Sequence, residues 1–104
     1  MNSEQKTIGG LSVGLINQII DLINNYSNPK RIILYGSRAR GDYTRTSDID
    51  LALENVSSTY LVKDVLEERT DTLLFFDIVI LDSIRPQLRQ RILMEGKVLY
   101  EQQF

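Results

Sequence analysis

The sequence predicts a single α/β domain whose small mixed β-sheet is flanked by helices. Along its 104 residues, segments with helical hydrophobic spacing alternate with short apolar runs typical of strands, in the order helix, strand, strand, helix, strand, helix, strand. A chain of this length folds as one domain, and a hydrophobic content of 42% is enough for one core. We therefore expect residues 1–10 to form a flexible N-terminal extension and residues 11–104 to form the domain.

The first expected helix begins near Leu11, with Ser12 as a suitable N-cap. The cluster Asn24–Pro29 is rich in residues that break helices, so the helix should end there. The next segment, Arg31–Tyr35, is β-branched and apolar and is closed by a Gly-Ser dipeptide, which indicates a buried strand. The helix itself is predicted by apolar residues at helical spacing, namely Leu15, Ile16, Ile19, Ile20 and Ile23.

The middle of the chain predicts two further strands and a helix between them. Residues 48–54 alternate between polar and apolar side chains with a period of two, which is typical of a strand. Residues 60–69 carry apolar side chains at helical spacing, and residues 73–81 form the most hydrophobic expected strand.

The C-terminal part predicts one more helix and a short edge strand. Ser83 is a suitable N-cap, Pro86 falls in the first turn, and Gly96 suits the position just beyond the helix. Residues 97–100 should then form the edge strand. The apolar stripe of this helix consists of Ile84, Leu88 and Ile92.

The composition excludes several classes of chemistry. The chain has no Cys and no His, which excludes disulfides, thiolate nucleophiles, Cys/His zinc sites and Ser-His-Asp triads. Twelve basic and fourteen acidic residues give a net charge of -2, which disfavours direct binding to nucleic acid. No apolar run is long enough to span a membrane, and residues 1–10 resemble no signal peptide, so we expect a cytoplasmic protein without membrane contact.

Three aspartates are candidates for catalysis and metal binding. Asp48 and Asp50 share one face of the expected strand, where two like charges repel unless a cation such as Mg²⁺ lies between them. Asp77 lies inside the most hydrophobic strand, where a charge is costly unless it is paired or bound to metal. If the two strands are neighbours, the three carboxylates can converge on one or two ions. The alternatives are a solvated strand edge for the first pair and an ion pair with Arg31 or a turn cap for Asp77.

A candidate phosphate site precedes these aspartates. Gly36 and Ser37 follow a buried strand and precede a short helix, so that backbone amides and a hydroxyl are available to an anion. Arg38, Arg40 and Arg45 form a basic cluster of a size that suits a triphosphate. The alternative is a simple turn, and the Walker P-loop motif is absent.

The sequence resembles the DNA polymerase beta-like nucleotidyltransferase superfamily, and in particular its minimal nucleotidyltransferase (MNT) branch. The resemblance rests on Gly36-Ser37, ten intervening residues and Asp48-x-Asp50, and it extends to the ending Ile-Leu-x-Glu-Gly-x-x-Leu-Tyr at residues 92–100. It implies that Gly36 and Ser37 bind the phosphates of ATP and that Asp48 and Asp50 hold Mg²⁺. Asp77 would be a third metal ligand or the base for the incoming hydroxyl.

The resemblance also implies a partner and a reaction. MNT proteins are typically antitoxins of HEPN toxins, which are RNases, and characterised members resemble protein adenylyltransferases that move AMP from ATP to a tyrosine of the toxin. We therefore expect an Mg²⁺- and ATP-dependent nucleotidyltransferase in a hetero-oligomer with a HEPN toxin. Two alternatives stay open: an antitoxin that only blocks its partner sterically, and a nucleotidyltransferase that acts on small molecules.

Overall fold

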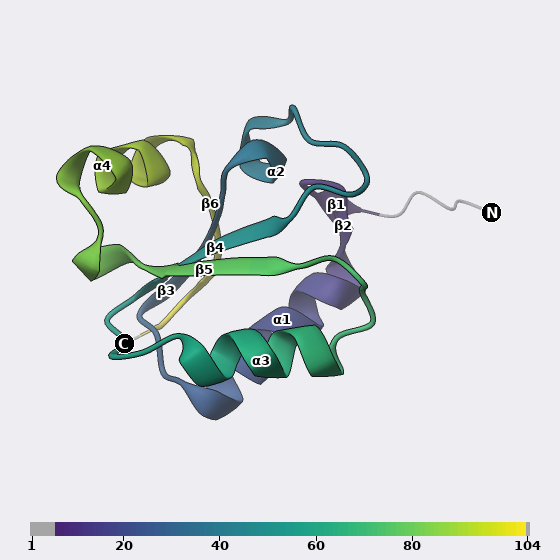
Figure 1. The fold of residues 1–104 in the computed structure, drawn as a ribbon, viewed down its shortest axis with the longest axis horizontal. Helices are drawn as coiled ribbons and strands as arrows, with labels where there is room; N and C mark the ends of the chain where they lie inside the picture. The colour runs from purple at the N-terminus through teal and green to yellow at the C-terminus, as the bar shows by residue number, and fades with distance from the viewer. Residues whose placement is uncertain (1–5, 104) are drawn as a thin grey trace.

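A four-stranded mixed β-sheet forms the centre of the fold, and the computed structural model describes residues 6–103 of the chain (Figure 1). A separate hairpin of two very short strands precedes it. The elements in chain order are β1 (Thr7–Ile8), β2 (Leu11–Ser12), α1 (Val13–Tyr26), β3 (Arg31–Tyr35), α2 (Ser37–Arg40), β4 (Ile49–Glu54), α3 (Tyr60–Arg69), β5 (Phe76–Ile80), a 3-10 turn (Leu81–Ser83), α4 (Pro86–Glu95) and β6 (Lys97–Glu101).

The strand order in the main sheet is β5-β4-β3-β6. β4 pairs antiparallel with β3 and parallel with β5, while β6 pairs antiparallel with the other side of β3. The predicted mixed sheet, the order of the elements from α1 onward and the edge position of the last strand are thereby confirmed. Because β4 and β5 are parallel neighbours, their first residues lie at the same end of the sheet.

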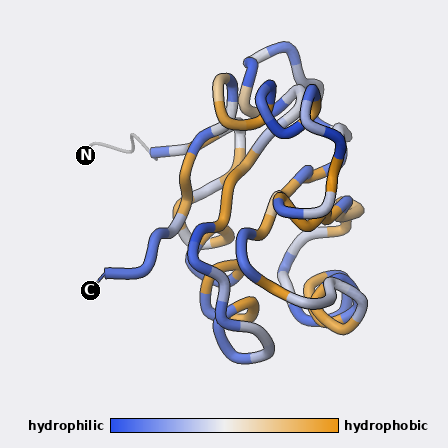
Figure 2. The backbone as a smooth tube through the Cα atoms, turned by 90° about the vertical axis from the view of Figure 1, so that its left-hand side faces the viewer, coloured by the Kyte–Doolittle hydropathy of each residue, from blue (hydrophilic) through white to orange (hydrophobic). Residues whose placement is uncertain are grey.

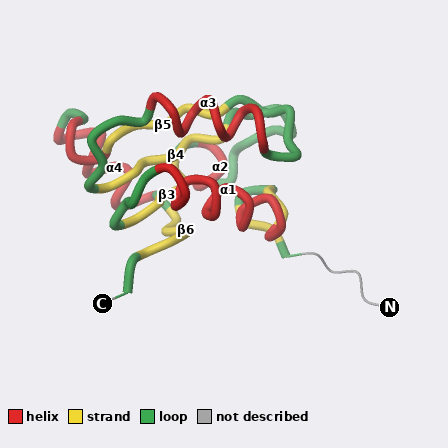
Figure 3. Tube along the Cα trace, turned by 90° about the horizontal axis from the view of Figure 1, so that it is seen from below, coloured by secondary structure: helices red, strands yellow, loops and turns green. Residues whose placement is uncertain are grey.

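The two faces of the sheet are covered unequally. α1 and α3 lie together across one face, as seen from below the molecule (Figure 3), and α4 lies on the other face. Hydrophobic residues are concentrated along the strands, and many of the loop residues are hydrophilic (Figure 2). The larger core includes Ile19, Ile23, Ile32, Leu34, Ile49, Leu51, Leu53, Leu66 and Phe76, whereas the core under α4 consists of Ile33, Ala52, Leu81 and Ile92.

Several local predictions are confirmed by the backbone. The Leu15 N–H donates to Oγ of Ser12 over 3.1 Å, so that Ser12 caps α1 as its position indicated. β3 and α3 have the predicted bounds. Among residues 6–103, no helix combines the length and the apolar character that crossing a bilayer requires.

The prediction of a flexible extension over residues 1–10 is wrong for its last part. Residues 1–5 lie outside the described part of the chain, but Thr7 and Ile8 pair antiparallel with Ser12 and Leu11. The tight turn between the two strands is possible because Gly9 and Gly10 both have positive φ angles, of 60° and 76°.

Two predictions at the later boundaries are also corrected. The strand predicted over residues 73–81 covers only Phe76–Ile80, because its pairing with β4 begins with Phe76 opposite Ile49. Ser83 lies in the 3-10 turn, and Arg85 occupies the N-cap position of α4 without a side-chain hydrogen bond. Gly96 directly follows α4, as predicted, and has a φ of -72°. A Cβ there would lie 2.5 Å from the side chain of Ile33, and glycine is therefore required by close packing of the chain on β3.

Candidate functional site

The turn that follows β3 is set directly against the first residues of β4. Gly36 has a φ of 73°, and a Cβ at this position would collide with the carboxylate of Asp50. The turn continues into α2, where the amides of Ala39 and Arg40 donate to the Gly36 carbonyl over 3.1 and 3.0 Å. Glycine thus allows a backbone conformation that L side chains avoid and an approach to Asp50 that no side chain permits. The half-buried Ser37 begins α2 beside this contact.

Residues of three adjacent strands form a row across the sheet face that carries α4. Tyr35 is the register partner of Asp50, and Asp50 is the register partner of Asp77. Partners in register point to the same face, so the predicted proximity of the two aspartates is confirmed. Asp48 is exposed and lies just before β4, and Asp77 is exposed on β5.

Asp50 is the electrostatic centre of this row. Its partial burial raises its pKa, and the negative charges of Asp77 and then Asp48 raise the pKa further, while Arg40 acts in the opposite direction. The carboxylates are therefore close enough to repel one another, as the sequence predicted. A group of like charges around a half-buried carboxylate is a suitable environment for a cation.

Tyr35 belongs to the site and was missed by the sequence analysis. Burial raises the pKa of its hydroxyl to about 12, and the charges of Asp77 and Asp50 act in the same direction. Strand pairing alone places it there, because β3 and β4 run antiparallel with Tyr35 opposite Asp50. The signal that could have revealed it is its position directly before Gly36, at the end of a strand whose neighbour carries the aspartates.

The predicted role of Arg38 in nucleotide binding does not fit its position. The residue is 3% exposed, and its guanidinium donates to backbone carbonyls on every side. Nε donates to the Ser47 carbonyl over 3.1 Å and Nη1 to the Gly9 carbonyl over 2.8 Å. Nη2 donates to the carbonyls of Thr44 and Arg45 over 3.4 and 3.2 Å. With these donors engaged inside the protein, Arg38 cannot also reach a phosphate.

Arg38 instead holds the segments around the site together. Its carbon Cζ lies 5.0 Å from the centre of the Tyr43 ring, which adds a cation–π contact to the hydrogen bonds. The acceptors belong to the β1–β2 turn and to the loop over residues 41–48 that leads to Asp48. Since Arg38 follows Ser37 directly, it connects the glycine turn to the segment that delivers the aspartates.

The other two basic residues of the predicted cluster are exposed. Arg40 lies 3.5 Å from a carboxylate oxygen of Asp42 and 3.8 Å from one of Glu95, and its charge partly opposes the rise in the pKa of Asp50. Arg40 therefore stays a candidate for contact with an anionic ligand. Arg45 is exposed in the loop before β4.

The predicted convergence of three carboxylates into one metal cage is not present in the described part of the chain. Over residues 6–103, no three His, Cys, Asp or Glu side chains meet in an arrangement that could hold a metal ion. The donor set nevertheless fits Mg²⁺, which usually takes one or two protein carboxylates and completes its shell with water and substrate phosphates. Asp48 and Asp50 provide such a pair beside the glycine turn.

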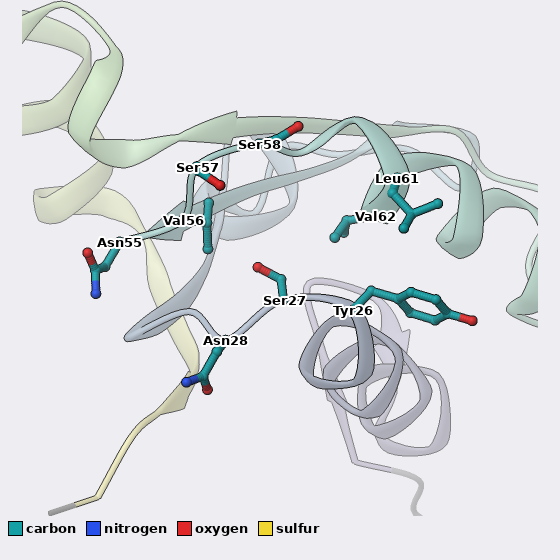
Figure 4. Close-up of a pocket in the computed structure, with 9 residues that line it drawn as sticks. All are labelled: Tyr26, Ser27, Asn28, Asn55, Val56, Ser57, Ser58, Leu61 and Val62. Atoms are coloured by element: carbon teal, nitrogen blue, oxygen red, sulfur yellow. The ribbon is translucent and has the colours of Figure 1, made fainter.

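A hollow at the opposite end of the sheet is separate from this site (Figure 4). It has a volume of about 350 Å³ and lies between the end of α1 and the loop from β4 to α3. Asn55 and Val56 line it just beyond the last residue of β4, whereas Asp48 and Asp50 lie at the first residues of that strand. The side chains that line it are uncharged, so it offers none of the acidic chemistry found at the other end.

Acidic residues on neighbouring strands beside a glycine turn are typical of α/β domains that transfer phosphoryl groups. Comparison with known proteins gives the family within this class. The chain belongs to the family described as Polymerase beta, Nucleotidyltransferase, whose profile matches residues 17–104.

A curated relative and solved structures agree with this assignment. The chain is 38% identical over 82 residues to the Methanocaldococcus jannaschii protein named "Putative protein adenylyltransferase MJ0604", covering 68% of this chain and 78% of that protein. A crystal structure described as a toxin-antitoxin with AMP-PNP is similar with a TM-score of 0.69 and 30% identity, over 85% of this chain and 74% of that chain. A structure of a tri-AMPylated Shewanella oneidensis HEPN toxin with its MNT antitoxin shares the fold, with a TM-score of 0.65 and 24% identity over 85% of this chain and 71% of that chain.

Proposed function

We propose that this chain is a protein adenylyltransferase that transfers AMP from ATP to a tyrosine of a HEPN-type toxin and thereby acts as an antitoxin. The family and the relative named as a protein adenylyltransferase support the reaction. The similar toxin-antitoxin structure that contains AMP-PNP supports both the nucleotide and the kind of partner.

The contact between Gly36 and Asp50 is the observation on which the proposal depends most. It brings a turn suited to phosphate within van der Waals distance of a carboxylate suited to a cation. Folding alone does not favour this arrangement, since it combines a left-handed backbone with carboxylates that repel one another. Binding a nucleotide together with a divalent cation explains both features.

The residues of the site then have distinct roles. The backbone at Gly36 and the hydroxyl of Ser37 bind the phosphates, and Arg40 adds positive charge next to them. The tyrosine hydroxyl of the partner attacks the α-phosphorus of ATP, the bond to the β-phosphate oxygen breaks, and pyrophosphate leaves. Asp77 accepts the proton of the attacking hydroxyl, since it is exposed beside Asp50.

Asp48 and Asp50 would hold Mg²⁺, which would neutralise the negative charge that develops on the transferred phosphate. Asp77 is proposed as the base rather than as a ligand, because the three carboxylates do not form a single cage within residues 6–103. Tyr35 lies beside Asp50 on the neighbouring strand and would keep water away from one side of its carboxylate.

The test uses the full chain and the purified protein encoded by the neighbouring gene, incubated with ATP and Mg²⁺. We expect the intact mass of that protein to increase by one or more AMP units and peptide mapping to place AMP on a tyrosine. An Asp48→Ala variant is the control and should leave the mass unchanged. Tight binding without any mass increase would refute the proposal in favour of steric neutralisation, and adenylylation of small hydroxylated molecules alone would refute it in favour of the small-molecule alternative.

A further inference from the structure

The loop that leads into β5 exposes two large apolar side chains. Leu73 is 98% exposed and Phe75 is 68% exposed. Beside them lies a hollow of about 640 Å³ that is lined by residues 71–75 and by Arg45 and Thr46 of the loop before β4. Apolar side chains exposed to this degree beside a hollow are typical of a surface that another protein covers. We call this region the 73–75 surface.

The 73–75 surface is continuous with the proposed active site. The amide of Ile49 donates to the Phe75 carbonyl over 2.9 Å, which places Phe75 beside the residue that precedes β4, Asp48. Phe76 is buried in the larger core, whereas its two neighbours in the chain, Phe75 and Asp77, are both exposed. Figure 1 shows the two loops that form this surface at the same end of the sheet.

The geometry of nucleotidyl transfer determines the side from which an acceptor arrives. In an in-line displacement, the attacking and leaving oxygens lie on opposite sides of the phosphorus. The proposed phosphate turn follows β3, the aspartates Asp48 and Asp50 lie at β4, and Asp77 lies on the edge strand β5. If pyrophosphate leaves on the β3 side, the acceptor hydroxyl must approach from the β5 side, past the 73–75 surface.

The charges around the hollow favour one kind of partner segment. Asp71 also lines the hollow, and its Oδ2 accepts a hydrogen bond over 3.1 Å from the neutral side-chain amide of Gln18 on α1, which holds the carboxylate toward α1 without cancelling its charge. Arg45 lines the same hollow and forms no ion pair among the residues that the structure describes. An apolar wall next to an unpaired cation is complementary to an apolar side chain flanked by a carboxylate.

We infer that the 73–75 surface is the docking surface for the acceptor protein, which binds it through an apolar segment flanked by an acidic residue and so brings its hydroxyl to Asp77. The inference rests on the proposed function and adds the surface that selects the substrate. Leu73 and Phe75 supply the apolar contact, and Arg45 supplies the charge.

The test compares two double variants of the full chain for binding to the purified protein encoded by the neighbouring gene. Leu73→Ser/Phe75→Ser removes the proposed surface. Tyr60→Ser/Leu61→Ser is the matched control, because these apolar side chains at the start of α3 are also exposed, by 80% and 55%. Since all four side chains are exposed, both variants should melt at the wild-type temperature.

We expect the Leu73→Ser/Phe75→Ser variant to bind the acceptor protein at least about tenfold more weakly. Its KM for that protein should rise, while its kcat at saturating acceptor and its affinity for ATP with Mg²⁺ stay as in the wild type. The control variant should match the wild type in every measurement.

Several outcomes would overturn the inference. These are unchanged acceptor binding by the Leu73→Ser/Phe75→Ser variant, weakened binding by the control variant instead, or no binding by the wild type. A dimer of the wild type in sedimentation that the Leu73→Ser/Phe75→Ser variant loses would assign the surface to a second copy of this chain. Failure of the proposed function can be distinguished from failure of this inference. In the first case the wild type would bind the acceptor without transferring AMP to it, and the comparison of the two double variants would still test the docking surface.

Discussion

Replacing Arg38 by lysine tests whether this buried guanidinium holds the loop that delivers the aspartates. Arg38 donates four hydrogen bonds to backbone carbonyls, and the three donors of a lysine ammonium cannot reproduce the planar arrangement of the guanidinium N–H groups. A hydrogen bond from a charged group contributes about 1.5–3 kcal/mol, and a buried carbonyl left without a donor costs about 1–3 kcal/mol. With about half of the contacts retained, we expect Arg38→Lys to lower the free energy of unfolding by about 3 kcal/mol.

The assay is thermal and urea denaturation of the full chain, with hydrogen exchange of the amides in residues 41–48 as a local measurement. A loss of about 3 kcal/mol corresponds to a fall in Tm of roughly 12–24 °C for a domain of this size. Exchange in the loop should accelerate more than exchange in β3. Arg40→Lys is the matched control, because Arg40 is exposed and should change stability by less than about 0.5 kcal/mol. An equally small loss in Arg38→Lys would refute the reasoning.

Three further predictions concern the carboxylates and the glycine turn. Asp48→Ala and Asp50→Ala should each lower AMP transfer at least about 100-fold in a labelled-ATP assay while circular dichroism stays unchanged, and near wild-type transfer in both would contradict the proposed mechanism. Asp50→Asn should raise the Tm of the metal-free protein at pH 7. The pKa of Asp50 is raised above 3.8 on folding, so ionisation of this carboxyl destabilises the folded wild type as the pH rises through the folded pKa. The gain in Tm of the Asp50→Asn variant should therefore vanish below about pH 4, which Tm measured across pH would reveal. Gly36→Ala should lower the free energy of unfolding by about 1–3 kcal/mol through backbone strain and should also displace Asp50. Denaturation would detect the first effect and ATP titration the second. Wild-type behaviour in both measurements would show that the turn is less constrained than its φ indicates.

The sequence predicted the features of this fold that depend on local patterns. Period-two alternation identified β4, and the breaker cluster and Ser12 defined the limits of α1, because these signals act within a few residues. The β1–β2 hairpin was missed, because its four paired residues give too short a pattern and its order depends on Arg38, 29 residues further along the chain.

The candidate site shows the same division between local and distant effects. Asp48, Asp50 and Gly36 were found from their spacing, and the contact between Gly36 and Asp50 agrees with their proposed cooperation. Tyr35 was missed because its proximity to Asp77 arises only when three strands pair in register. Arg38 was assigned to the phosphates because an arginine after a Gly-Ser turn gives no sequence sign of whether it points outward or into the protein.

The hydrogen bonds of Arg38 have a consequence for how freely the loop before β4 can change its sequence. All four acceptors are backbone carbonyls, which every amino acid provides, so the contacts of Arg38 do not depend on the side chains of residues 44–46, although the hydroxyls of Thr44 and Thr46 also form a hydrogen bond within the loop. Arg45 and Thr46 are two of those side chains, and both line the hollow of the 73–75 surface. If the 73–75 surface docks the acceptor as inferred, a substitution of Arg45 would change which acceptor protein is recognised while the contacts of Arg38 keep Asp48 in position. A chain built in this way would acquire a new partner by point mutation and retain its proposed chemistry.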